Sequence, residues 1–183
     1  MQKLKVLGNG SFSRVELKLN GNVRIITDDP IKRAMADGVF PDHPLFPKVT
    51  KIGTEKNSGK SIYEMERLDV IDGWDDVRAC LNKRNVRLFK ALHKMRTCDH
   101  QSTWDALYYE LPNEFERERN VIMDAISNLQ EYYDIDDVVN LDFLFGNVAH
   151  QNGRIVLMDI FFPVSELREK LDTKYESQSK VSS

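Results

Sequence analysis

One stretch decides the fold of this protein: Asn140-Leu141-Asp142-Phe143-Leu144-Phe145-Gly146-Asn147-Val148. It sets a carboxylate at Asp142 five residues before a carboxamide at Asn147, with a glycine just before the amide. A second carboxylate, Asp159, follows a turn signal and an apolar run. The turn signal is Gln151-Asn152-Gly153, because Asn-Gly readily adopts the positive φ values of a tight hairpin. The hairpin should return Asp159 to the first loop, where three side-chain oxygens would suit Mg²⁺ and its attached phosphates.

A glycine-rich pattern near the N-terminus is the second motif. Gly8 and Gly10 occupy the first two positions of GxGxxG, and Ser13 stands at the third. Small residues let a backbone approach phosphates closely, and Val15 follows where it could cover an adenine ring. The pattern lies between two expected strands, whereas a dinucleotide-binding loop would open a helix. This context favours a hairpin that covers nucleotide phosphates, and an ordinary glycine-rich hairpin is the alternative on this segment alone.

Composition limits the class of protein. The 183 residues suit one domain with a sizeable core, and 41% apolar with 30% charged residues is typical of soluble globular proteins. A net charge of −3 gives no support for binding nucleic acid or a membrane surface through bulk electrostatics. Cys80 and Cys98 make neither a disulfide framework nor a metal site, which indicates a reducing cytoplasm. No apolar run reaches the length of a signal peptide or a membrane span.

The first third of the chain is expected to form an antiparallel sheet and one short helix. Helix boundary signals lie at 28–38, where an Asp precedes Pro30 and Gly38 ends the segment. The expected strands, each bounded by turn residues, cover residues 4–7, 15–19, 23–26, 46–52 and 60–68.

The middle of the chain is expected to be helical. A helix is predicted from about 76 to 96, with a basic face that we expect to be solvated together with His93. A short helix at 104–111 and a long one at 112–133 should follow, the second with an apolar stripe that belongs to the core. A charged helix is expected from Ser165.

These residues resemble the protein-kinase-like superfamily, and more narrowly the early serine/threonine protein kinases of T-seven-like podophages. The segment 7–13 is similar to the Gly-rich loop of those kinases. The segments 141–148 and 154–159 resemble their catalytic loop and metal-binding segment. The resemblance covers roughly 4–68 and 140–164, and the middle matches only in helical character.

The resemblance implies an α+β fold of the minimal bilobal protein-kinase-like kind. Residues 1–68 would form the N-terminal lobe, with an antiparallel sheet, one short helix and a closing hinge. Residues 69–176 would form a truncated, mainly helical C-terminal lobe, since some two dozen residues follow Asp159. Residues 177–183 would be a disordered tail.

The resemblance also assigns roles within the site. Asp142 would be the base for the acceptor hydroxyl or would orient it, and Asn147 and Asp159 would hold Mg²⁺. At the hinge, the Glu66 carbonyl and the Leu68 amide would read the edge of the adenine. The ATP molecule would be covered by the residues Gly8, Asn9, Gly10, Ser11, Phe12, Ser13 and Val15.

The chain departs from the kinase pattern at several positions. The third strand carries no Lys, and Arg24 is its only cation, two residues before Ile26, where the Lys would fall. Because residues i and i+2 share a strand face, Arg24 could replace that Lys, and a plain surface Arg is the alternative. The short helix at 28–38 has no Glu. Leu144 stands where the catalytic loop usually has Lys or His, and Asp159-Ile160-Phe161 replaces the usual DFG.

Three functions follow from this pattern. The first is a serine/threonine protein kinase that uses ATP and Mg²⁺ and acts on proteins in the cytoplasm of a bacterial host. The second is an inactive pseudokinase that binds a host protein and inhibits or redirects it. The third is a small-molecule kinase of the aminoglycoside type, because Gly146-Asn147-Val148 and 153–159 also look like that branch. The acceptor and the oligomeric state do not follow from the sequence.

Overall fold

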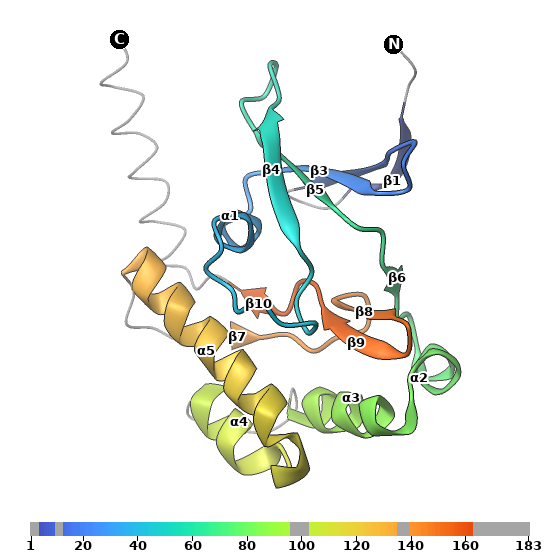
Figure 1. The fold of residues 1–183 in the computed structure, drawn as a ribbon, viewed down its shortest axis with the longest axis vertical. Helices are drawn as coiled ribbons and strands as arrows, with labels where there is room; N and C mark the ends of the chain where they lie inside the picture. The colour runs from blue at the N-terminus through green and yellow to red at the C-terminus, as the bar shows by residue number, and fades with distance from the viewer. Residues whose placement is uncertain (1–3, 10–12, 96–102, 135–139, 163–183) are drawn as a thin grey trace.

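A five-stranded antiparallel sheet forms the upper part of the molecule in Figure 1. The structure is a computed structural model, which describes residues 4–9, 13–95, 103–134 and 140–162. The strand order in the sheet is β1-β2-β3-β5-β4. The strands are β1 (Lys5–Asn9), β2 (Ser13–Leu17), β3 (Val23–Thr27), β4 (Val49–Thr54) and β5 (Ser61–Met65).

Helix α1 (Pro30–Ala36) packs beside β4, as Figure 1 shows. The side chain of Asp29 caps it, because Oδ1 accepts a hydrogen bond from the N–H of Ile31 at 2.8 Å. Proline at the first helical position needs no N–H partner there, and Gly38 follows the helix with φ of 77°. The expected short helix is therefore confirmed, and its apolar side is buried in the core through Ile31, Ala34 and Met35.

The second part of the molecule consists of helices and two small antiparallel sheets. The small sheets lie between the five-stranded sheet and the helices α3, α4 and α5 (Figure 1). Their strands are β6 (Asp69–Val70), β8 (Val148–Gln151) and β9 (Arg154–Leu157) in one sheet, and β7 (Asn140–Leu141) and β10 (Phe161–Phe162) in the other. The helices are α2 (Trp74–Cys80), α3 (Lys83–Met95), α4 (Thr103–Glu110), the 3₁₀ turn η1 (Asn113–Phe115) and α5 (Glu116–Tyr133).

The helix expected at 76–96 is instead two helices. Leu81 has an extended backbone with φ of −98° and ψ of 145°, which ends α2. Asn82 then starts α3, because its Oδ1 accepts a hydrogen bond from the N–H of Asn85 at 2.9 Å. The expected helix from Ser165 and the tail at 177–183 lie outside the described residues.

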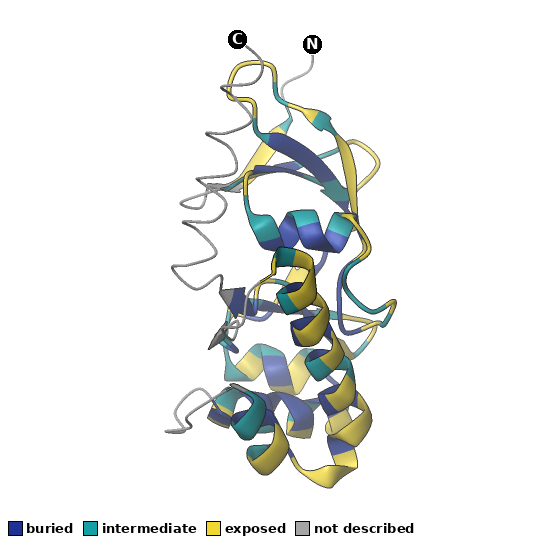
Figure 2. Ribbon diagram, turned by 90° about the vertical axis from the view of Figure 1, so that its left-hand side faces the viewer, coloured by how far each residue is buried: buried dark blue, intermediate teal, exposed yellow. Residues whose placement is uncertain are grey.

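One hydrophobic core joins the five-stranded sheet, α1, the small sheets and the helices. Figure 2 shows that the helices of the second part have a buried side and an exposed side. On α5 the buried side is formed by Ile122, Ala125, Ile126 and Leu129, as the apolar stripe predicts. The α+β class is confirmed. Among the described residues, no helix is both long and apolar enough to cross a membrane.

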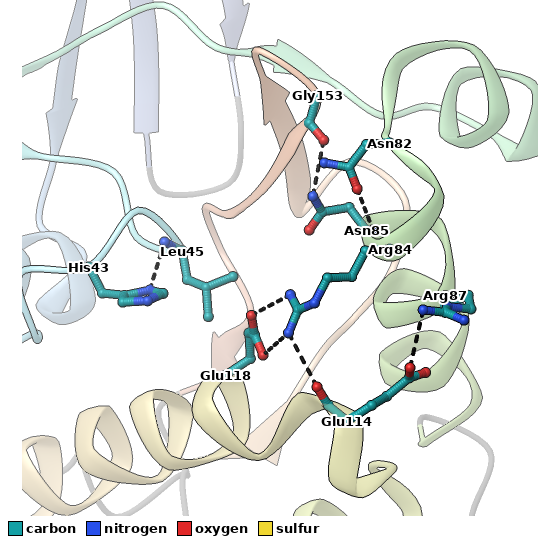
Figure 3. A network of polar contacts seen from close by, with 9 residues as sticks. All are labelled: His43, Leu45, Asn82, Arg84, Asn85, Arg87, Glu114, Glu118 and Gly153. Carbon is teal, nitrogen blue, oxygen red and sulfur yellow. Dashed lines mark hydrogen bonds and ion pairs between the residues drawn. The ribbon is translucent and has the colours of Figure 1, made fainter.

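A polar network fixes the β8–β9 hairpin to the helices (Figure 3). The carbonyl oxygen of Gly153, at the hairpin turn, accepts hydrogen bonds from the backbone N–H of Asn82 and from Nδ2 of Asn85, each at 3.1 Å. Arg84, also on α3, donates two hydrogen bonds to the carboxylate of Glu118 on α5, at 2.6 and 2.9 Å. The start of α3 therefore holds both the hairpin and α5, which sets where the chain after β9 lies.

Candidate functional site

Asn147 is hydrogen-bonded to the carboxylate of Asp142. Nδ2 of Asn147 lies 2.9 Å from Oδ2 of Asp142 and 3.3 Å from its backbone oxygen. Since neither oxygen of a carboxylate can donate, the amide must present its NH₂ group to Asp142. In this orientation the NH₂ group of Asn147 donates to Asp142, and Oδ1 of Asn147 can accept a hydrogen bond or bind a cation.

The backbone of Asn147 also holds Asp159. The carbonyl oxygen of Asn147 accepts hydrogen bonds from the N–H of Met158 at 2.9 Å and of Asp159 at 3.1 Å. The N–H of Asp142 in turn donates to the carbonyl of Ile160 at 2.6 Å. The structure therefore brings Asp142, Asn147 and Asp159 together, and the side chain of Asp159 remains 56% exposed.

Two turns create this arrangement. The hairpin turn predicted from Asn-Gly is present, with φ of 51° at Asn152 and 76° at Gly153. In the loop before β8, Gly146 has φ of 90°, a value that L-residues rarely adopt. Its N–H donates to the carbonyl of Ile71 at 2.9 Å, which fixes the loop beside β6 and sets the direction of Asn147.

Lys32 is a site residue that the sequence analysis missed. It projects from α1, and its Nζ donates to the carbonyl of Met158 at 2.7 Å. The same atom lies 3.7 Å from Oδ1 of Asp159. Lys32 is 8% exposed, so the charge is nearly removed from water. The helical spacing of Lys32 gave no signal for this contact, because the partners are 126 positions apart in the chain.

Asp29 adds a second carboxyl group near this pair. Burial raises the pKa of Asp29, Lys32 opposes that rise, and the negative charge of Asp159 adds to it. The three charged groups therefore form a cluster at the junction of α1 with the end of the β9 segment.

The glycine-rich motif is described in part. Gly8 and Asn9 lie in β1, opposite Val15 and Arg14 of β2, and Ser13 begins β2. The positions Gly10, Ser11 and Phe12 lie outside the described residues. The hairpin of two strands predicted around this motif is present, because β1 and β2 are paired antiparallel.

Val15 and Arg24 lie on opposite faces of the sheet. Val15 is the direct partner of Ile25, so both side chains lie on one face, and both belong to the core that includes α1. Arg24 precedes Ile25 and must lie on the other face, where its Nη1 donates to Oε2 of Glu16 at 3.3 Å. The structure does not bring Arg24 to Asp159, so Arg24 does not replace the strand Lys at this site.

The expected hinge lies between the large sheet and the small ones. Glu66 and Leu68 follow β5 and precede β6. Leu68 is buried, whereas the exposed carboxylate of Glu66 accepts a hydrogen bond from Nε2 of Gln151 at 2.5 Å. The roles of the Glu66 carbonyl and the Leu68 amide toward an adenine stay predictions.

His93 does not belong to a solvated face, contrary to expectation. Its Nδ1 lies 2.9 Å from the carbonyl oxygen of Phe143, so Nδ1 must carry the proton. The ring stacks on Phe89 at 5.6 Å and contacts Trp74 and Phe145 edge-on or tilted. Its position four residues after Phe89, on the apolar side of α3, was the available signal. His93 therefore supports the loop that carries Asp142.

The donor set of the site fits a hard divalent cation. Mg²⁺ is bound in proteins by one or two carboxylates, other oxygens and water. Asn147 Oδ1 and the exposed carboxylate of Asp159 are oxygens of this kind. Within the described part of the chain, no group of three or more His, Cys, Asp or Glu residues could hold a metal ion. A site here would therefore depend on the amide of Asn147 as well as on carboxylates.

Two comparisons with known proteins were negative. No protein-family model matches the sequence, and a search of curated proteins found no match.

Proposed function

We propose that this protein is an ATP- and Mg²⁺-dependent phosphotransferase. The observation that carries the proposal is the double role of Asn147. Its side chain binds the carboxylate of Asp142, and its backbone binds the N–H of Asp159. A base, an amide ligand and an acidic ligand are the polar groups that phosphoryl transfer requires of the protein on this side of a nucleotide.

Each side chain has a distinct role in this reaction. One oxygen of Asp142 is engaged by Asn147, and the other is available to accept a hydrogen bond from an acceptor hydroxyl and to orient it. Asn147, through Oδ1, and Asp159 would hold Mg²⁺, which when bound supplies positive charge to the phosphate oxygens. The β1–β2 hairpin would cover the phosphates, and Val15 would lie against the adenine. Catalysis would rest mainly on positioning and charge.

The proposed acceptor is a serine or threonine hydroxyl of a protein in the cytoplasm of a bacterial host. This part of the proposal is supported by the resemblance to podophage kinases alone. A small-molecule hydroxyl remains an alternative acceptor for the same reaction.

A protein that binds without turnover is the second candidate, and the position of Arg24 favours it. The third strand has no Lys, and Arg24 is bonded to Glu16 on the far face of the sheet. A chain that keeps the kinase-like scaffold but lacks a phosphate-binding cation on β3 would act by binding a partner.

The test compares wild-type protein with Asp142→Asn. The matched control is Asp42→Asn, which changes an exposed surface aspartate that pairs with Lys48. Purified proteins are incubated with γ-labelled ATP, Mg²⁺ and a bacterial lysate. We expect label on the chain or on lysate proteins with wild type and Asp42→Asn, and a large loss with Asp142→Asn.

Two results would count against the proposal. Labelling that is the same for Asp142→Asn and wild type would exclude Asp142 as the base. Absence of both labelling and any MgATP-dependent rise in melting temperature would exclude nucleotide binding, because a ligand of the folded state must stabilise it. A rise in melting temperature without labelling would favour the second candidate.

A further inference from the structure

We propose that Lys32 binds a phosphate group of the nucleotide at the site of Asp142, Asn147 and Asp159, and so supplies the positive charge that β3 does not bring to this site. The inference rests on the proposed function, because it names the residue that would hold the phosphates in that reaction.

The ammonium group of Lys32 is buried, and the described residues satisfy only part of its hydrogen-bonding capacity. Lys32 is 8% exposed, and among the described residues its Nζ makes one hydrogen bond, of 2.7 Å, to the carbonyl of Met158. The carboxylate oxygen within ion-pair range in the described part of the chain is Oδ1 of Asp159, at 3.7 Å, which is too long for a hydrogen bond. An ammonium carries three donors, and burying a charged group is costly unless its donors are satisfied. The unused donors beside Asp159 fit an anionic ligand.

Lys32 follows β3 closely in the chain and carries its charge to the site at Asp159. Helix α1 begins three residues after Thr27, the last residue of β3. The start of α1 is held in place from the other side, because Tyr133 Oη donates to the carbonyl of Pro30 at 2.6 Å. The side chain of Lys32 then reaches across to the Met158–Asp159 segment. A helix residue thereby brings its charge to the carboxylate that would hold Mg²⁺.

The rival cation is excluded by its contacts. The guanidinium of Arg24 is engaged with Glu16 on the face of the sheet opposite to Val15 and Ile25. The apolar residues of α1 share a core with Ile25, so α1 and Lys32 lie on the other side of the sheet from Arg24.

The first test uses wild-type protein and an acyl-phosphate ester of ATP. A neutral lysine amine beside the terminal phosphates attacks the acyl carbon and forms a C–N bond. The acyl C–O bond breaks, ATP leaves with its electron pair, and the nitrogen releases a proton to solvent, which leaves an amide on that lysine. We expect mass spectrometry to find the acyl group on Lys32, and an excess of MgATP to suppress it. Acylation at other lysines only, with the same suppression by MgATP, would overturn the inference.

The second test measures MgATP-dependent thermal stabilisation of four variants. Lys32→Met keeps an unbranched apolar side chain without the charge, and Lys32→Arg keeps the charge. Arg24→Met removes the rival cation, and Lys51→Met, which changes an exposed lysine of β4, is the matched control. We expect Lys32→Met to lose most of the rise in melting temperature caused by MgATP, Lys32→Arg to retain part of it, and the other two to behave as wild type.

The outcomes separate this inference from the proposed function. If MgATP stabilises wild type and Lys32→Met equally, Lys32 does not bind phosphate, although nucleotide binding stands. If MgATP neither stabilises wild type nor suppresses acylation, the proposed function fails and the inference with it. If Lys32→Met does not fold, the acylation result on wild type decides. In wild type, AMP should raise the melting temperature less than ATP does. If this difference between AMP and ATP is absent in Lys32→Met, Lys32 acts on the phosphates and not only on the fold.

Discussion

The carboxamide nitrogen of Asn147 lies 2.9 Å from Oδ2 of Asp142, while the carbonyl oxygen of Asn147 accepts the N–H of Asp159. One residue thus ties the carboxylate of Asp142 to the backbone of Asp159. A substitution at Asn147 should therefore change the contact with Asp142, which the side chain makes, and keep the contact with Asp159, which the backbone makes.

Changing Asn147→Asp should make the fold dependent on Mg²⁺. The new carboxylate would lie against Asp142, and two close carboxylates repel unless a cation or a shared proton separates them. We expect the free energy of unfolding in EDTA to fall by about 1–2 kcal/mol relative to wild type. Added Mg²⁺ should raise the melting temperature of the variant more than that of wild type. Equal responses of the two proteins to Mg²⁺ would contradict a cation site at this position.

Changing Gly146→Ala should destabilise the loop before β8. Gly146 has φ of 90°, and a side chain at such a backbone angle costs about 1–2 kcal/mol. A Cβ at this position would meet no heavy atom within 4 Å, so the cost should come from the backbone alone. Urea unfolding of Gly146→Ala, with Gly73→Ala as a control at a glycine whose φ is not in the positive range, measures it. A smaller loss in Gly146→Ala than in the control would show that the angle carries no strain.

Changing Arg84→Met should loosen the attachment of α5 to α3. Glu118 is 8% exposed and receives two hydrogen bonds from Arg84, so its carboxylate would be left buried without this partner. We expect a loss of about 1–3 kcal/mol in the free energy of unfolding. Arg87 is also on α3, and its pair with Glu114 of η1 is more exposed, so Arg87→Met should cost less than about 1 kcal/mol. Equal losses in the two variants would mean that burial of Glu118 does not matter.

The same pair predicts how stability depends on pH. The hydrogen bonds from Arg84 are the largest cause of a lowered pKa of Glu118, below its ordinary value of 4.5. Because the pKa in the folded state is the lower one, the ionised carboxylate favours folding. Its contribution is therefore complete above pH 4.5 and is lost as the pH falls through the folded-state pKa. Glu118→Gln should lose less stability than wild type over that acid range in urea unfolding. Identical slopes would show that Glu118 does not titrate differently in the two states.

The sequence by itself determined the local elements of the site. Asn152-Gly153 fixed the hairpin, because that pair accepts the backbone angles of a tight turn. An Asp before a Pro fixed the start of α1, since the carboxylate accepts a backbone N–H that the helix leaves unpaired. The apolar stripe of α5 was equally clear, because its period of 3.6 residues is a property of the chain alone.

Only the tertiary structure decided which side chains meet at the site. The contacts of Lys32 with the Met158–Asp159 segment and of His93 with Phe143 join residues on different elements. The direction of Arg24 depends on which face of the sheet packs on α1, and a strand pattern with Ile25 and Ile26 both buried leaves that face undecided. Such contacts depend on the packing of the whole core. The relative position of distant segments is set by the burial of many apolar side chains together and not by local backbone preference.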